Sequence, residues 1–208
     1  MLEPVKKQRR GEETKKKILK VALKLFSDKG FNNVTVDEIV KKSGTSKGSF
    51  YQHFRTKSDI FLVRFTEVDD YYLEVFQSFP KDMDPLEKLS IFSRKMMRFL
   101  DEEMGKGLMK VIYSAALESN EHTYFLNSNR SLFKITRSLV EEAMNKGAID
   151  REYSVDEVIT IITQSYMGTI YHWGLQDSDR GLESFSIPIT QTILRGLEAK
   201  NKYEGPIQ

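Results

Sequence analysis

The chain has 208 residues with 39% hydrophobic content, which is enough for a hydrophobic core and typical of one domain or two small ones. No apolar run approaches the ~20 residues needed to cross a bilayer, and the N-terminus is charged where a signal peptide is apolar, so we expect a cytoplasmic protein with no membrane partner. The lack of cysteine excludes disulfides, thiolate metal sites and cysteine nucleophiles.

The net charge of +2 conceals a strong asymmetry along the chain. Residues 1–57 hold 15 Lys and Arg against 6 Asp and Glu, a net charge of +9, whereas residues 58–208 hold 17 against 24, a net charge of −7. A basic segment favours a polyanionic partner, because neutralising phosphates releases counterions and supplies most of the nonspecific affinity. Nucleic acid and an anionic membrane surface both fit this charge, and so does a basic face that is merely solvated.

Apolar residues recur at three- and four-residue spacing almost throughout, which predicts an all-α protein. The first residues form a basic arm that we expect to be disordered, with Arg9 and Arg10 free to reach along DNA or into a minor groove. The first predicted helix has an apolar face between Ile18 and Phe26 and ends at Gly30.

Two short helices follow inside the basic segment. Thr35 and Glu38 have the spacing of a capping box, which opens a helix that ends at Gly44, and Thr45 or Ser46 caps the next. A short helix, a tight glycine turn and a second short helix form the pattern of a helix-turn-helix. In that geometry the first residues of the second short helix enter the major groove of DNA.

The residue types around this turn suit contacts to DNA. Lys47 offers a charge to phosphate or a donor to guanine, and Thr45 and Ser49 can contact base edges. Gly48 lets the backbone approach closely, because it has no side chain. Among the remaining candidates, Tyr51 and His53 have polar tips for phosphate oxygens, and Thr35 and Lys57 lie at helix N-termini, where phosphates bind well.

Residues 14–61 resemble the DNA-binding domain of the TetR family of bacterial transcriptional regulators. The resemblance implies DNA contacts at Thr35, Thr45, Ser46, Lys47, Gly48, Ser49, Tyr51, His53 and Lys57. Three positions depart from the family pattern: Val40, Ser43 and Thr45 stand where a small residue, an alanine and a valine are usual. The last departure bears on base preference, and therefore on the operator sequence.

The rest of the chain predicts a helical domain. A helix from Ser58 to about Phe79 joins the two parts, and Asp84 with Pro85 opens the next, which ends at the glycines 105 and 107. Further helices are predicted at about 108–117, 124–147, 154–173 and 186–200. The last two helices have wide apolar surfaces, which indicates that a second copy covers them in a homodimer. A symmetric dimer would also contact both half-sites of a pseudo-palindromic operator. The alternative is that these two helices complete the monomer core.

We therefore predict two domains: a basic arm with a helix-turn-helix in residues 1–57, and an effector-binding and dimerisation domain in residues 58–208. Methionines and aromatic residues between residues 83 and 173 favour a pocket for a small, largely apolar effector, although most of them are also good core residues. The candidate pocket residues are Met96, Met97, Met109, Tyr113, Phe125, Tyr166 and Trp173.

The predicted function is a ligand-responsive regulator that binds an operator and acts as a repressor. The alternative is a helix-turn-helix activator, or a regulator controlled by a protein partner. An enzyme is disfavoured, because the sequence has three histidines, no cysteine and no phosphate-binding loop, and we expect no cofactor. Glu118, Glu121 and His122 supply too few ligands for a closed zinc site, so we expect no metal.

Overall fold

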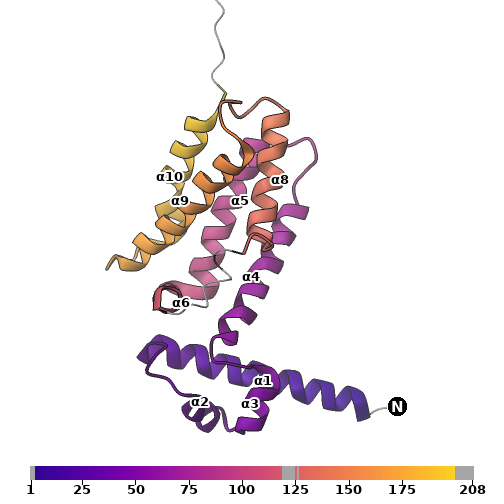
Figure 1. The fold of residues 1–208 in the computed structure, drawn as a ribbon, viewed down its shortest axis with the longest axis vertical. Helices are drawn as coiled ribbons and strands as arrows, with labels where there is room; N and C mark the ends of the chain where they lie inside the picture. Colours follow the sequence, from indigo (N-terminus) through magenta and orange to yellow (C-terminus); the bar gives the residue numbers. More distant parts are fainter. Residues whose placement is uncertain (1–2, 119–124, 126, 200–208) are drawn as a thin grey trace, which may run out of the picture. The chain divides into compact units, whose positions relative to one another are not determined.

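The computed structural model describes residues 3–118, 125 and 127–199, and within them the fold is all-α, as predicted (Figure 1). No strand forms in this part of the chain, where Ile149 and Glu198 make one isolated antiparallel bridge. The helices group into two compact units, residues 1–67 with 105–125, and residues 68–104 with 126–208. The predicted boundary at residue 57 concerns function and stays a prediction.

The first unit contains the helix-turn-helix. It consists of α1 (Glu3–Lys29), α2 (Val36–Ser43), α3 (Lys47–His53), the first half of α4 (Asp59–Gln77) and α6 (Gly105–Glu118). Helices α2, α3 and α6 all contact α1. Their apolar faces bury a core that includes Ile18, Ala22, Phe26, Ile39, Phe50, Phe54 and Phe61.

The predicted stops and starts of these helices are confirmed. Gly30 and Gly44 have φ values of 79° and 60°, the left-handed conformation that ends a helix at low cost only for glycine. Thr35 caps α2 by accepting a hydrogen bond from the backbone N–H of Glu38 at 3.2 Å. The Glu38 carboxylate does not complete the predicted box, because it accepts from the Lys29 ammonium at 2.6 Å and so ties α2 to the end of α1.

The prediction of a disordered basic arm was wrong for the described residues. Helix α1 begins at Glu3, so Arg9 and Arg10 lie on a helix. The segment is rich in Lys, Arg, Gln and Glu, which are good helix formers, and Arg9 pairs with Glu13 one turn later at 3.5 Å. Composition alone suggested disorder because this stretch has no apolar face to bury.

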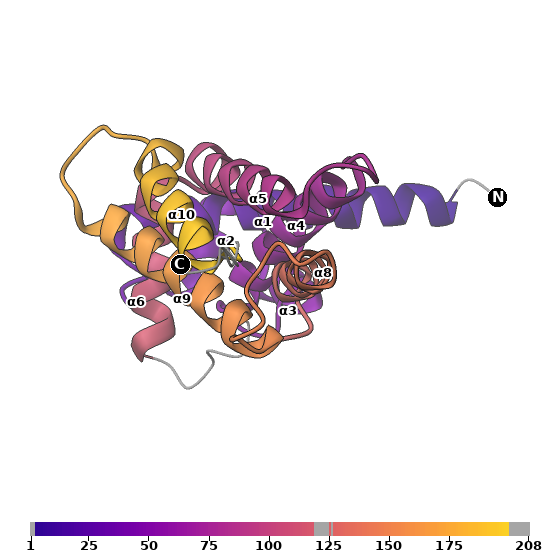
Figure 2. The same cartoon turned by 90° about the horizontal axis from the view of Figure 1, so that it is seen from above.

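The second unit is a helical bundle. It contains the second half of α4, α5 (Pro85–Phe99), α8 (Ser131–Asn145), α9 (Val155–Leu175) and α10 (Leu182–Leu197). Helices α5, α8, α9 and α10 lie side by side in both views (Figures 1 and 2). The start signals are again confirmed, since Asp84 caps α5 ahead of Pro85 and Ser154 forms a complete capping box with Glu157.

Helix α5 does not end directly at the glycines. It passes into a π-helical segment, η1 (Leu100–Met104), and the chain turns at Gly105, whose φ is 71°. Gly107 is not a breaker but lies inside α6, where a Cβ atom would stand 3.0 Å from the Ser27 hydroxyl of α1. This glycine therefore permits the close approach of α6 and α1.

The last helix begins earlier than predicted. Helix α10 starts at Leu182, so Pro188 lies inside the helix and not in its first turn. Proline has no N–H group and leaves the carbonyl of Ser184, four residues earlier, without its usual donor. The Arg180 guanidinium donates to that carbonyl at 2.7 Å, which compensates for the missing hydrogen bond.

A largely buried ion pair attaches α4 to α8 within the second unit. The Arg130 guanidinium donates twice to the Asp69 carboxylate, at 3.1 and 2.9 Å, and the two side chains are only 10% and 19% exposed. Removing one member of such a pair leaves a charge without its partner in a poorly solvated place.

Asp69→Asn is accordingly expected to lower the free energy of unfolding by about 2 kcal/mol. Urea denaturation followed by circular dichroism measures this change. The adjacent Asp70→Asn alters the same charge at an exposed position and should have little effect. Equal stabilities for the two variants would contradict a stabilising role for the Arg130 pair.

Candidate nucleic-acid interface and effector region

The turn between α2 and α3 is held by local hydrogen bonds. The hydroxyls of Ser43 and Thr45 bond to each other at 2.8 Å, and the backbone N–H of Thr45 donates to the Val40 carbonyl at 3.0 Å. Ser46 caps α3 by accepting from the backbone N–H of Ser49 at 3.1 Å. The buried ring of Phe50 fixes α3 on the core of the unit, so the angle between the two helices is set by packed groups.

Several of the nine predicted DNA contacts form an exposed surface on these helices. Thr35, Ser46, Lys47, Gly48 and Tyr51 are exposed, and the Tyr51 side chain is 55% accessible while its ring rests edge-on against Phe50. They belong to α3 and to the helix caps at the starts of α2 and α3. This surface can offer hydroxyls, an ammonium and backbone N–H groups to a single partner.

Thr45, Ser49, His53 and Lys57 are partly buried. The Thr45 and Ser49 hydroxyls already bond to Ser43 and Ser46, and the His53 ring lies beside Gly11 of α1, 3.8 Å from where a Cβ atom would be. Contacts from these side chains to DNA remain a prediction.

Lys57 has a structural role. Its ammonium donates to the carbonyls of Phe31 and Val34 at 2.7 and 3.0 Å and lies 4.3 Å from the centre of the Phe31 ring. Burial lowers the pKa of this lysine, which is the direction expected for a cation withdrawn from water. The side chain thus fixes the loop between α1 and α2, and a phosphate contact would have to share its ammonium with these carbonyls.

Sequence reasoning missed two candidates on this surface. Gln52 is exposed on α3 between Tyr51 and His53, and its amide is a suitable group for adenine. The Lys17 ammonium of α1 lies 3.6 Å from the place of a Cβ atom on Gly44, beside the turn. Helical periodicity could have identified Gln52, but the approach of Lys17 depends on tertiary packing.

The seven predicted effector-pocket residues divide between the two units. Met96, Met97, Tyr166 and Trp173 are buried in the second unit. Burial raises the pKa of Tyr166 to about 12, and its neutral hydroxyl forms a hydrogen bond with Ser93. The Trp173 indole N–H donates to the Arg180 carbonyl at 3.0 Å, so this side chain is part of the monomer core.

The other three predicted residues lie in the first unit. The rings of Tyr113 and Phe125 are 5.1 Å apart, and Phe125 also contacts Phe65 at 5.6 Å between centroids. Burial raises the pKa of Tyr113, as it does for Tyr166. The two groups of aromatic residues are thus two local clusters.

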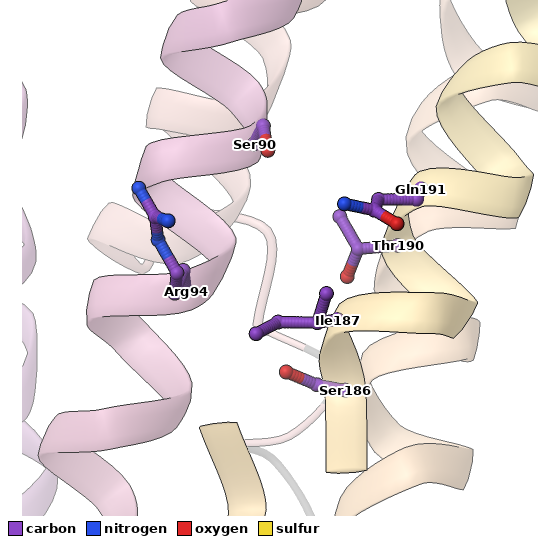
Figure 3. Close-up of a pocket in the computed structure, with 6 residues that line it drawn as sticks. All are labelled: Ser90, Arg94, Ser186, Ile187, Thr190 and Gln191. Atoms are coloured by element: carbon purple, nitrogen blue, oxygen red, sulfur yellow. The ribbon is translucent and has the colours of Figure 1, made fainter. Parts of the chain in front are cut away.

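Two cavities lie elsewhere. One of about 40 Å³ in the second unit opens between α5 and α10 and is lined by Ser90, Arg94, Ser186, Ile187, Thr190 and Gln191 (Figure 3). Its volume holds only a few water-sized groups, which is too small for a metabolite-sized effector. The other, about 270 Å³ in the first unit, lies between the loop 30–33 and α6. None of the seven predicted residues lines either cavity.

One buried polar group of the second unit has no partner in the described structure. The Thr136 hydroxyl on α8 is fully buried and makes no hydrogen bond to any described residue. A buried hydroxyl in this condition costs free energy unless a water or a ligand supplies the missing bond.

The described residues contain no group of three or more His, Asp and Glu able to hold a metal ion. Glu121 and His122 lie outside the described residues, as does the side chain of Glu118. Within the same part of the chain, no helix is long and apolar enough to span a membrane.

Comparison with known proteins identifies this architecture. A family model described as "Bacterial regulatory proteins, tetR family" matches residues 18–63, which include the whole helix-turn-helix. The chain is 28% identical over 178 residues to the HTH-type transcriptional regulator AcrR of Shigella flexneri, covering 81% of each protein.

Solved structures with the same fold include a putative TetR-family transcriptional regulator from Syntrophomonas wolfei, with a TM-score of 0.76, 19% identity and coverage of 93% of this chain and 99% of that one. An ArpA-like gamma-butyrolactone receptor matches with a TM-score of 0.62 and 21% identity over 93% and 92% of the two chains. The matched proteins are regulators and not enzymes. Residues 18–63 therefore form a DNA-binding domain of the TetR family, and the chain is a DNA-binding transcriptional regulator.

Proposed function

We propose that the protein is a homodimeric transcriptional repressor that leaves a pseudo-palindromic operator when a small, largely apolar effector binds. The observation that carries the proposal is the exposed surface on α3 and the two helix caps, where Ser46, Lys47, Gly48 and Tyr51 face outward from a rigid turn. Residues 1–57 would bind DNA in the cytoplasm, and residues 58–208 would bind the effector and form the dimer.

The DNA contacts fall into two groups by chemistry. Backbone N–H groups at the start of α2, with Thr35, and the side chains of Tyr51 and His53 suit phosphate oxygens, which fix the position of the protein on DNA. Lys47, Gly48 and the hydroxyls of Thr45, Ser46 and Ser49 lie at the start of α3 and suit base edges in the major groove.

The exposed face of α9 supports the dimer. The exposed apolar side chains Ile161, Tyr171 and Leu175 recur along one stripe centred on Gly168, and Leu175 is 60% accessible. Ile189 and Ile193 of the neighbouring α10 are also only partly buried. A second copy covering both helices would form a four-helix interface and remove this apolar surface from water.

The effector would bind in the second unit. Support comes from the buried Thr136 hydroxyl, from the Tyr166 and Ser93 hydroxyls in an apolar core, and from the similarity of the fold to a gamma-butyrolactone receptor. Helix α4 contributes to both units, so a shift of α4 would change the separation of the two recognition helices. A hundredfold loss of operator affinity requires the effector to favour the released state by about 2.7 kcal/mol.

Selection of DNA from a random-sequence pool by the purified protein tests the function. We expect an inverted repeat to be enriched, and its affinity to fall steeply with salt, because a dimer would contact two half-sites and many phosphates. Failure to enrich any sequence, with protein both as purified and after unfolding and refolding to remove bound ligand, would contradict the proposal.

Thr136→Val is expected to raise the free energy of unfolding by about 1 kcal/mol in protein without effector, because valine has nearly the same shape and no hydroxyl to leave unpaired. Urea denaturation measures the change. Thr163→Val is the matched control, since the Thr163 hydroxyl is also buried but donates to the Ile159 carbonyl at 2.8 Å, and its loss should destabilise the protein. A loss of stability in Thr136→Val would show that the hydroxyl already has a partner.

A further inference from the structure

The Lys47 ammonium, which we assign to DNA binding, forms an ion pair with an acidic side chain. The Asp37 carboxylate, in the first turn of α2, lies 2.6 Å from the Lys47 ammonium, in the first turn of α3. The pair links the starts of the two helices of the helix-turn-helix. Both side chains remain largely in solvent, at 67% and 59% exposure, so a third group can reach them.

We propose that Asp37 is an internal competitor of the DNA phosphates for Lys47 and that it limits binding to DNA of the wrong sequence. This inference rests on the proposed function, since it takes Lys47 as a DNA contact. A carboxylate and a phosphate are both oxyanions with similar demands on an ammonium group, so DNA must displace Asp37 before Lys47 can bind it.

The exchange is reversible because the ion pair is weak. Exposed pairs of this kind contribute little to stability, since both charges are well hydrated and salt screens them. A phosphate in DNA attracts the Lys47 ammonium together with its neighbouring phosphates, so DNA can displace the single carboxylate of Asp37. Asp37 reduces the affinity without blocking the site.

The salt dependence of binding distinguishes this competitor from an ordinary acidic residue. When a phosphate takes Lys47, the DNA releases a counterion, and the Asp37 carboxylate that loses its partner recruits a cation from solution. The net release of ions is smaller than the number of phosphate contacts implies. Without Asp37 the slope of log affinity against log salt should steepen by up to about one for each subunit.

The neighbouring acid shows what a purely structural pair looks like in the same turn. Glu38 is mostly buried between lysines and accepts from Lys29 at 2.6 Å, which joins α2 to α1, with Lys42 at 4.0 Å. The Lys29 hydrogen bond lowers the pKa of the Glu38 carboxyl group. Glu38→Gln therefore changes the same charge in the same helical turn without releasing Lys47, and it is the matched control for Asp37→Asn.

The test measures the affinity of the full-length protein for its selected operator and for a scrambled duplex, between about 50 and 200 mM salt, by fluorescence anisotropy. Asp37→Asn should bind the scrambled duplex on the order of fivefold more tightly at the lower salt, with a steeper slope and a smaller ratio of operator to scrambled affinity. Glu38→Gln should change the slope less.

The same substitution in a Lys47→Ala background identifies the cause. With no ammonium to release, Asp37→Asn should lose most of its effect. An equal gain in DNA affinity in both backgrounds would show that Asp37 acts by general repulsion and would overturn the proposal. A salt slope that is unchanged in Asp37→Asn alone would also overturn it. If Lys47→Ala itself leaves operator affinity unchanged, the assigned DNA surface is wrong, and the proposed role of Asp37 is refuted together with it.

Discussion

Gly168→Arg is expected to prevent the proposed dimer from forming while the chain stays folded. Gly168 is at the centre of the exposed stripe of α9, and a Cβ atom there would meet no described heavy atom within 4 Å. Inside the monomer the change is favourable, because Gly costs a helix interior about 1 kcal/mol relative to good helix formers. In a dimer built on this stripe, the same arginine would be a buried charge without a partner.

Sedimentation velocity across a range of protein concentrations measures the change, and thermal unfolding shows that the helices persist. We expect dimer dissociation to become at least a hundredfold easier, and operator affinity to fall with it because two half-sites are no longer linked. Ser138→Arg on the exposed face of α8 adds the same charge and should remain a dimer. A Gly168→Arg protein that is still dimeric at micromolar concentration would exclude the α9 face as the interface.

Trp173 lies on the same helix as Gly168 but cannot serve as the position for this test. Its side chain, predicted to line a pocket, is 2% exposed, and its indole N–H donates to the Arg180 carbonyl. A charged group there would destabilise the monomer and give no information about dimerisation. Periodicity locates an apolar helix face, but it does not tell which of two apolar faces is covered by the same chain.

Helix boundaries followed from the sequence where the signal is local. The interactions that start or end these helices join residues within one helical turn, so a short stretch of sequence is enough to predict them. Examples are the caps at Ser154 and Asp84 and the left-handed glycines at 30 and 44. Pro188 shows the limit of such rules. The Arg180 side chain donates to the carbonyl that the proline leaves without a donor, and no helix-start rule predicts this hydrogen bond.

Residue types on the DNA surface were predicted, but their partners were not. Sequence identified Lys47 and Lys57 as two similar cations near helix N-termini. The structure separates them, because Lys57 binds the carbonyls of Phe31 and Val34 while Lys47 faces solvent beside Asp37. These partners lie 10 to 26 residues away in the sequence, at a range where helical spacing carries no information about contacts.

Lys47→Ala is expected to weaken operator binding about a hundredfold with no loss of stability. The side chain is 59% exposed and its ammonium pairs only with the exposed Asp37 among the ion pairs of the described residues, so the fold should depend little on it. One good contact to a guanine or a phosphate contributes roughly 1 to 3 kcal/mol, and a symmetric dimer loses two of them.

Anisotropy with the selected operator measures the loss, and unfolding curves confirm equal stability. Lys42→Ala is the control, since Lys42 is an exposed lysine on α2 whose nearest acid is Glu38, and it should cost far less. A loss from Lys47→Ala that is uniform across all DNA sequences would assign Lys47 to phosphate, whereas a loss confined to one operator position would assign it to a base. Because α3 is packed rigidly through Phe50, a loss confined to one operator position would also show that the first turn of α3 reaches the base edges in the groove.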